Sequence, residues 1–71
     1  MADINAVIEN NFKYHAPKDG QNEKYELIRA TAKTLAYLID EDCPASREKS
    51  LAMTKLEESV MWANASIARN G

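Results

Sequence analysis

The stretch NEKYELIRATAKTLAYLIDEDCPASREKSLAMTKLEESVMWANASIAR, residues 22–69, determines the fold of the chain. In its middle, Pro44 cannot continue a helix and Ser46 can cap the next one. The apolar residues on both sides of this break recur every three or four positions, which is the spacing of one helix face. They are Tyr25, Ile28, Ala32, Leu35 and Ile39 before the break, and Met53, Leu56, Val60, Ala63 and Ile67 after it.

This spacing predicts two long helices, over residues 22–42 and 46–69. Asn22 offers a side-chain cap for the first helix, and Ser46 offers one for the second. Because only a short connection joins the two helices, we expect them to run antiparallel as a helical hairpin.

The part of the chain before the hairpin predicts one short helix and one irregular segment. Asp3 can cap a helix over residues 3–11, whose apolar residues lie on one side. Residues 12–20, FKYHAPKDG, show no periodicity; Pro17 favours an extended Ala16, and Asp-Gly indicates a turn. No linker separates two domains, so the sequence predicts a single all-α domain over residues 1–71.

Size and apolar surface together predict self-association. A chain of 71 residues buries too little surface to be very stable alone, and its single cysteine, Cys43, cannot form an internal disulfide. Each long helix also carries a second apolar set outside the face described above, which a two-helix unit leaves uncovered. We therefore expect a homo-oligomeric helical bundle. The second sets are Leu27, Ala30 and Leu38, and then Leu51, Met61, Trp62, Ala65 and Ala68.

Charge and hydropathy exclude several classes of protein. Nine Lys and Arg against eleven Asp and Glu give a formal net charge of -2, which argues against binding a long DNA or RNA polymer. No apolar run reaches the roughly 18 residues that a membrane span needs, and the start, MADINAVIENN, lacks the basic residues of a signal peptide. We expect a cytoplasmic protein, as the free thiol also suggests.

The sequence offers little for catalysis. His15 is the only histidine, and there is no glycine-rich phosphate loop or HExxH helix. One histidine and one cysteine are too few for a zinc site. The sequence therefore predicts a protein that is not an enzyme and needs no metal or cofactor.

A few residues are suited to binding a small anionic aromatic ligand. Tyr14 offers a ring on which a base can stack, or it packs the first helix against the hairpin. Arg29 and Thr31 can hold a phosphate, although a surface arginine on a helix needs no such role. His15 is a ligand contact or a structural histidine. Arg69 either interacts with the dipole of its own helix or meets other copies of itself around an anion.

Two segments carry a resemblance to a known family: FKYHAP (residues 12–17) and IRATAKTLAYLIDEDCPASREKSLAMTKLEESVMWANASIARN (residues 28–70). They resemble the small phage-encoded anti-CBASS sponge proteins, which sequester the cyclic oligonucleotide messengers of bacterial CBASS immunity. The run CPASREKSLAMTKLEESVMWANASIARN is the longest and most specific part of the resemblance.

The resemblance implies a helical subunit that assembles into a homohexamer in the cytoplasm of the infected bacterium. It implies that cyclic dinucleotides such as cGAMP bind uncleaved in pockets shared by two subunits, where Tyr14, Arg29 and Thr31 take the family's binding roles. Members of the family that the chain resembles can carry lysine at the position that corresponds to Arg29. The resemblance further implies that cyclic trinucleotides bind where three subunits meet, with His15 and Arg69 as candidates.

Two other functions remain open from the sequence. One is a phosphodiesterase with His15 as its acid or base, although no second catalytic group accompanies it. The other is a structural or regulatory phage protein, a helical oligomer that binds a host protein through its apolar faces.

Overall fold

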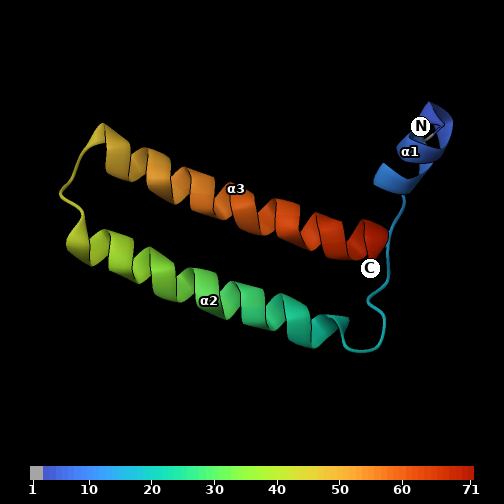
Figure 1. Cartoon of the computed structure of the whole chain (residues 1–71), viewed down its shortest axis with the longest axis horizontal. Coiled ribbons are helices and arrows are strands. Elements are labelled where there is room, and N and C mark those ends of the chain that lie inside the picture. The colour runs from blue at the N-terminus through green and yellow to red at the C-terminus, as the bar shows by residue number, and fades with distance from the viewer. Residues whose placement is uncertain (1–2) are drawn as a thin grey trace.

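The computed structural model describes residues 3–71, which form three helices: α1 (Ile4–Asn11), α2 (Gln21–Asp42) and α3 (Arg47–Asn70). Helices α2 and α3 lie side by side and antiparallel, joined by residues 43–46 (Figure 1). Helix α1 lies beyond the carboxyl end of α3 and points away from the hairpin. The predicted all-α hairpin with a short first helix is confirmed. None of these helices is long and apolar enough to cross a lipid bilayer.

Side-chain caps explain where two of the three helices begin. The Asp3 carboxylate accepts a hydrogen bond from the backbone N–H of Asn5 at 3.2 Å and begins α1. The Ser46 hydroxyl accepts from the backbone N–H of Lys49 at 3.1 Å and begins α3. Both caps were expected, because Asp and Ser side chains satisfy N–H groups that the first helical turn leaves unpaired.

The predicted Asn22 cap of α2 is wrong. Gly20 takes the cap position, with φ 81° and ψ −11°, and provides no side-chain hydrogen bond. Glycine adopts this left-handed conformation without steric cost. The chain thereby turns so that the backbone N–H of Gln21 donates to the Lys18 carbonyl at 3.0 Å, which begins the helix one residue earlier.

The seam between α2 and α3 contains the expected apolar residues, except that Ala36 takes the place expected for Leu35. Ala36 is half-buried in the seam, whereas Leu35 is 46% exposed and lies at its edge. No hydrophobic side chain among the described residues is fully buried. Two helices in contact cover only the stripe along which they meet, so neither long helix is enclosed.

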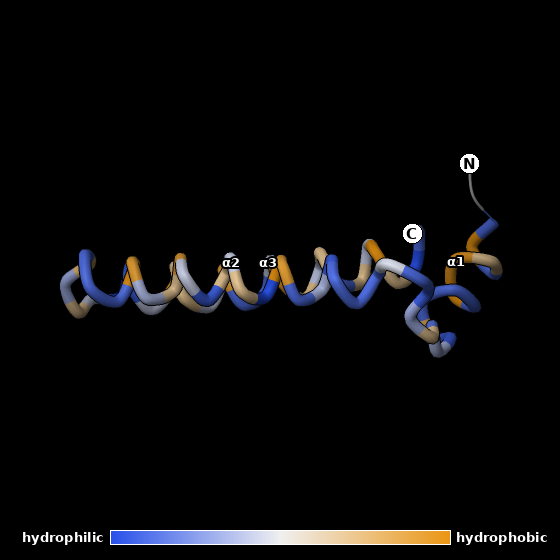
Figure 2. Tube along the Cα trace, turned by 90° about the horizontal axis from the view of Figure 1, so that it is seen from below, coloured by the Kyte–Doolittle hydropathy of each residue, from blue (hydrophilic) through white to orange (hydrophobic). Residues whose placement is uncertain are grey.

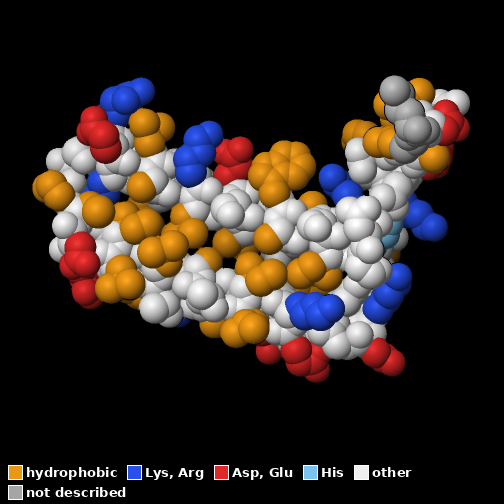
Figure 3. Space-filling view, viewed as in Figure 1, with side chains coloured by type: hydrophobic (Ala, Val, Ile, Leu, Met, Phe, Trp, Pro, Cys, Tyr) orange, Lys and Arg blue, Asp and Glu red, His pale blue; other side chains and the backbone are white. Residues whose placement is uncertain are grey.

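The hairpin is a single layer rather than a compact body. Its principal extents are 45 × 27 × 18 Å, and Figure 2 shows α2 and α3 superimposed when the layer is viewed edge-on. The accessible surface is 5910 Å², against about 4,500 Å² for a compact monomer of this mass. The radius of gyration is 15.6 Å, against about 11 Å for a globular chain of this length. Hydrophobic side chains gather along the hairpin on the face shown in Figure 3 and remain open to solvent.

Polar side chains fasten the irregular segment to the carboxyl end of α3. Gln21, 6% exposed, accepts from the backbone N–H of Lys18 at 2.9 Å and donates to the Ile67 carbonyl at 3.3 Å. The Lys18 ammonium donates to the Gly71 carbonyl at 2.9 Å, and the Asn10 amide donates to the Arg69 carbonyl at 3.2 Å. We call Asn10, Lys18 and Gln21 the C-terminal clamp. It supplies donors to carbonyls at a helix end, where partners within the helix are lacking.

The clamp predicts a measurable role for Gln21. Gln21→Ala removes the acceptor of the Lys18 N–H and one donor to Ile67, so the free energy of unfolding should fall by about 1–3 kcal/mol. Urea denaturation followed by circular dichroism, at one protein concentration, measures this change. Asn22→Ala is the matched control, because Asn22 is exposed in the same helical turn and should change stability by less than about 0.5 kcal/mol. Equal losses in the two variants would contradict the clamp.

Candidate functional site

A polar hollow lies where the irregular segment meets the end of the hairpin. It has a volume of about 360 Å³, and residues from the segment after α1, the first turns of α2 and the last turns of α3 line it. We call it the end hollow. The clamp positions it, because Asn10 and Gln21 tie both sides of the segment to α3. Its lining residues are Asn11, Lys13, Tyr14, His15, Tyr25, Asn64, Ala65, Ala68 and Arg69.

The end hollow has a basic and aromatic character. Lys13 and Arg69 contribute two cations, and none of its described lining residues is an Asp or Glu. Tyr14 is 83% exposed, so its ring is available to a ligand, while Tyr25 is half-buried. Aromatic rings next to cations suit a base that carries a phosphate. The alternative that Tyr14 packs α1 against the hairpin does not fit this exposure.

A single hydrogen bond orients the ring of His15. Its Nε2 lies 2.8 Å from the Asn10 carbonyl oxygen. Because a carbonyl oxygen only accepts, Nε2 must carry the hydrogen and donate it. Nδ1 is then the acceptor of the neutral ring. The half-buried His15 is therefore held structurally and still lines the end hollow.

Asn64 is a lining residue to which sequence reasoning assigned no role. Its side-chain oxygen is buried and has no hydrogen-bond partner among the described residues. A buried acceptor without a donor costs about 1–3 kcal/mol, so it needs a structural or functional explanation. One feature of the sequence could have indicated it. Asn64 is a polar amide between Ala63 and Ile67, two residues of the otherwise apolar seam.

Arg29 and Thr31 lie away from the end hollow, in two different grooves. The residues are two positions apart on α2, which is about 200° around a helix, so they face opposite sides of the hairpin. The Arg29 groove has a volume of about 370 Å³ and the Thr31 groove about 310 Å³. Each has an apolar floor formed by both long helices. The Arg29 groove is lined by Arg29, Ala32, Lys33, Ala36, Met53, Leu56, Glu57 and Val60, and the Thr31 groove by Leu27, Ile28, Thr31, Ala32, Leu35, Leu56, Ser59, Val60 and Ala63.

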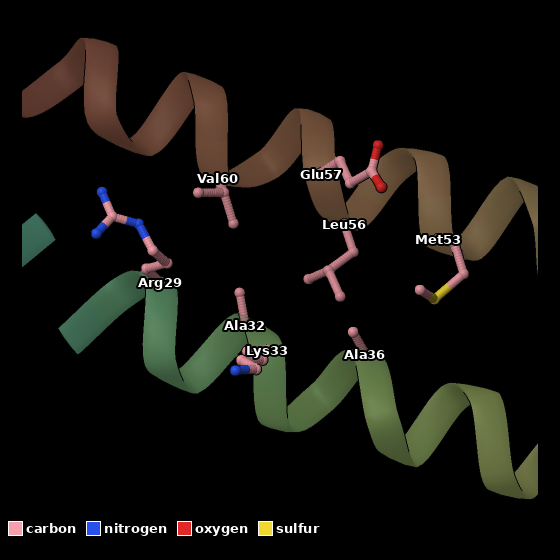
Figure 4. Close-up of a pocket in the computed structure, with 8 residues that line it drawn as sticks. All are labelled: Arg29, Ala32, Lys33, Ala36, Met53, Leu56, Glu57 and Val60. Atoms are coloured by element: carbon pink, nitrogen blue, oxygen red, sulfur yellow. The ribbon is translucent and has the colours of Figure 1, made fainter. Parts of the chain in front are cut away.

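The Arg29 and Thr31 side chains are both free to bind. In Figure 4, Arg29 reaches from α2 toward α3 at one end of its groove. It makes no ion pair within the described residues. The hydroxyl of Thr31 makes no hydrogen bond there either, whereas that of Thr34 donates to the Ala30 carbonyl of its own helix at 3.1 Å.

The structure thus groups the predicted residues differently from the resemblance. Tyr14, His15 and Arg69 line one hollow, although the resemblance divides them between two ligand sites. The resemblance unites Tyr14, Arg29 and Thr31 in one site. In a single chain, however, these three residues line three separate hollows. A ligand that contacts all three must therefore bind between chains. Within residues 3–71, no three His, Cys, Asp or Glu side chains gather so as to hold a metal ion.

Comparison with known proteins gives one match. The family model described as Acb2/Tad1, hairpin domain, matches residues 4–68, which includes all three helices almost completely. Neither the comparison with curated proteins nor that with solved structures gives a significant match.

The His15 hydrogen bond can be tested by NMR spectroscopy. Because the chain has one histidine, its ring signals are unambiguous. We expect a ring N–H proton on Nε2 that exchanges slowly with solvent and shows nuclear Overhauser contacts to Asn10, since this proton lies in a hydrogen bond. The urea-unfolded chain is the control and should lose both signals. A hydrogen on Nδ1 with Nε2 bare in the folded protein would contradict the geometry.

Proposed function

We propose, since the chain belongs to the Acb2/Tad1 hairpin domain family, that it binds cyclic di- and trinucleotides and holds them uncleaved. The family includes Acb2, a phage anti-CBASS cyclic nucleotide sponge. Sequestration by this chain would take place in the cytoplasm of the infected bacterium and keep CBASS effectors inactive. The observation that carries the proposal is the end hollow, where an exposed tyrosine lies beside two cations and no carboxylate.

The cyclic dinucleotide site is proposed to lie between two chains. Tyr14 stacks on a base, and the Arg29 fork and the Thr31 hydroxyl hold phosphates. Arginine suits this role because its guanidinium can donate two parallel hydrogen bonds to one phosphate. The absence of ion pairs at Arg29, among the described residues, leaves these donors available.

Assembly is part of the proposed function. The single layer exposes Leu27, Met61 and Trp62, and no hydrophobic side chain of the described chain is enclosed. Other copies of the chain would cover this surface, and the family resemblance favours a homohexamer. At points where three subunits meet, His15 and Arg69 are proposed to contact a cyclic trinucleotide. Both lie in the end hollow, with Arg69 on the last turn of α3.

Sequestration needs affinity and abundance rather than turnover. A sponge lowers the concentration of free messenger by mass action, in proportion to the number of sites and their affinity. Helices α2 and α3 provide walls that are already ordered, which reduces the conformational cost of binding. The end hollow contains His15 without an acidic partner, which supports binding more than hydrolysis.

Titration calorimetry with cyclic di- and trinucleotides tests the proposal. Wild-type protein should bind at least one of them, and Tyr14→Ala should weaken binding by about 5- to 150-fold, which corresponds to the loss of one stacked base. Tyr14→Phe keeps the ring and is the matched control. Nucleotide released from the loaded protein by heating should be intact. Absence of heat with every ligand, or recovery of linear product, would contradict sequestration.

A mixing experiment tests whether two chains share the dinucleotide site. Tyr14→Ala and Arg29→Ala chains should each bind poorly. If they are unfolded together and refolded as an equal mixture, about a quarter of the sites should combine an intact Tyr14 with an intact Arg29 from another chain. Calorimetry would then report that fraction of high-affinity sites. If each site were built within one chain, the mixture would recover no high-affinity sites. Tyr14→Ala refolded alone is the control and should recover none.

A further inference from the structure

Helix α1 is the part of the molecule least supported by its own chain. None of its residues is buried, and its apolar side chains Ile4 and Ile8 are 65% and 48% exposed. The clamp hydrogen bond from Asn10 holds only its last turn. An eight-residue helix is marginal in water, and most of its stability must come from packing of its apolar face. Figures 1 and 3 show α1 projecting beyond the hairpin with hydrophobic side chains uncovered.

Charge distinguishes which groove complements α1. From its Asp3 cap to Asn11 the helix carries Asp3 and Glu9 and no Lys or Arg. The Arg29 groove has an apolar floor with Arg29, Lys33 and Glu57 at its rim, a net positive lining (Figure 4). The Thr31 groove has no charged lining residue. An acidic amphipathic helix therefore fits the Arg29 groove better than the Thr31 groove.

The chain's own α1 cannot reach this groove. The clamp ties Asn10 to Arg69, at the carboxyl end of α3. The centre of the groove, at Leu56 and Glu57, is 12 or 13 residues earlier on α3, which is about 18 to 20 Å along the helix. Helix α1 is itself only about 12 Å long and points away from its own hairpin.

We propose that α1 of one copy lies in the Arg29 groove of a second copy, with Ile4 and Ile8 on its apolar floor. This inference rests on the proposed function in one respect, because it explains how the shared site is assembled. The negative carboxyl end of the α1 dipole lies toward Arg29 and Lys33. Tyr14 follows the end of α1 by three residues, a reach of about 10 Å, so docking brings Tyr14 of one chain to Arg29 of the other.

Disulfide pairing between two populations of chains tests the docking. One population carries Ile8→Cys and the other Glu57→Cys, both with Cys43→Ser, so that a bond between these two cysteine positions can form only between the populations, and mass spectrometry separates it from disulfides within one population. Glu57 lines the Arg29 groove, and Ser59→Cys, on the Thr31 groove, is the matched control. After mixed refolding and mild oxidation, we expect the Ile8–Glu57 cysteine pair to give about tenfold more cross-linked dimer than the control pair. Equal yields would overturn the proposal.

A second pair of variants tests the consequence for assembly. Ile8→Glu places a charge on the apolar floor, whereas Ala6→Glu places the same charge on the far side of α1. Ile8→Glu should give smaller species by analytical ultracentrifugation and weaken cyclic dinucleotide binding by about tenfold or more, while Ala6→Glu should do neither. Circular dichroism checks that the hairpin remains helical. An intact Ile8→Glu assembly would overturn the proposal.

The two proposals fail in different ways. If wild-type protein binds no cyclic nucleotide but the Ile8 and Glu57 cysteines pair, the function is wrong and the docking is correct. If Tyr14→Ala loses binding but the cysteines do not pair, the sponge function stands and the docking is wrong.

Discussion

Two helices in contact can bury only the stripe along which they meet, and the rest of this structure follows from that limit. The seam of α2 and α3 is half-buried at best, and no apolar side chain of the described chain is enclosed. A single copy therefore exposes apolar surface on both sides of the layer and on α1. Hydrophobic burial is the main favourable term in folding, and a single copy leaves much of this term unused.

The polar clamp decides where binding groups can gather. Gln21 and Asn10 pair with carbonyls at the end of α3, and the segment between them is thereby held against that end. Tyr14 and His15 lie on this segment, and Arg69 lies on the last turn of α3. Their proximity depends on hydrogen bonds to backbone carbonyls rather than on contacts among the three side chains.

Binding and assembly are coupled if the site is shared between chains. Arg29 and Thr31 face opposite sides of the layer, and neither lines the end hollow. A ligand that joins Tyr14 to Arg29 would stabilise the assembled form over separate chains by mass action. The same coupling would keep a dissociated chain from holding messenger. A small chain can in this way present a large enclosed site without a core of its own.

Local chemistry made the helices predictable, because capping and breaking depend on neighbours in the sequence. Asp3, Pro44 and Ser46 were sufficient to place the start of α1 and the turn of the hairpin. The start of α2 was misplaced at Asn22, because Gly20 takes the cap position and the side chain of Gln21 bonds to the Ile67 carbonyl of α3, a contact that the local sequence does not indicate. Ala36 rather than the expected Leu35 lies in the seam, and this difference likewise depends on how the helices pack.

The candidate site divides in the same way between sequence and structure. The sequence alone identified Tyr14, His15, Arg29, Thr31 and Arg69 as groups able to bind an anionic aromatic ligand, since that ability belongs to the side chains themselves. Only the tertiary structure united Tyr14, His15 and Arg69 with Lys13, Tyr25 and Asn64 in one hollow, and separated Arg29 from Thr31. The physical reason is that these neighbours are brought together by the clamp and the helix seam, which join residues about fifty positions apart along the chain.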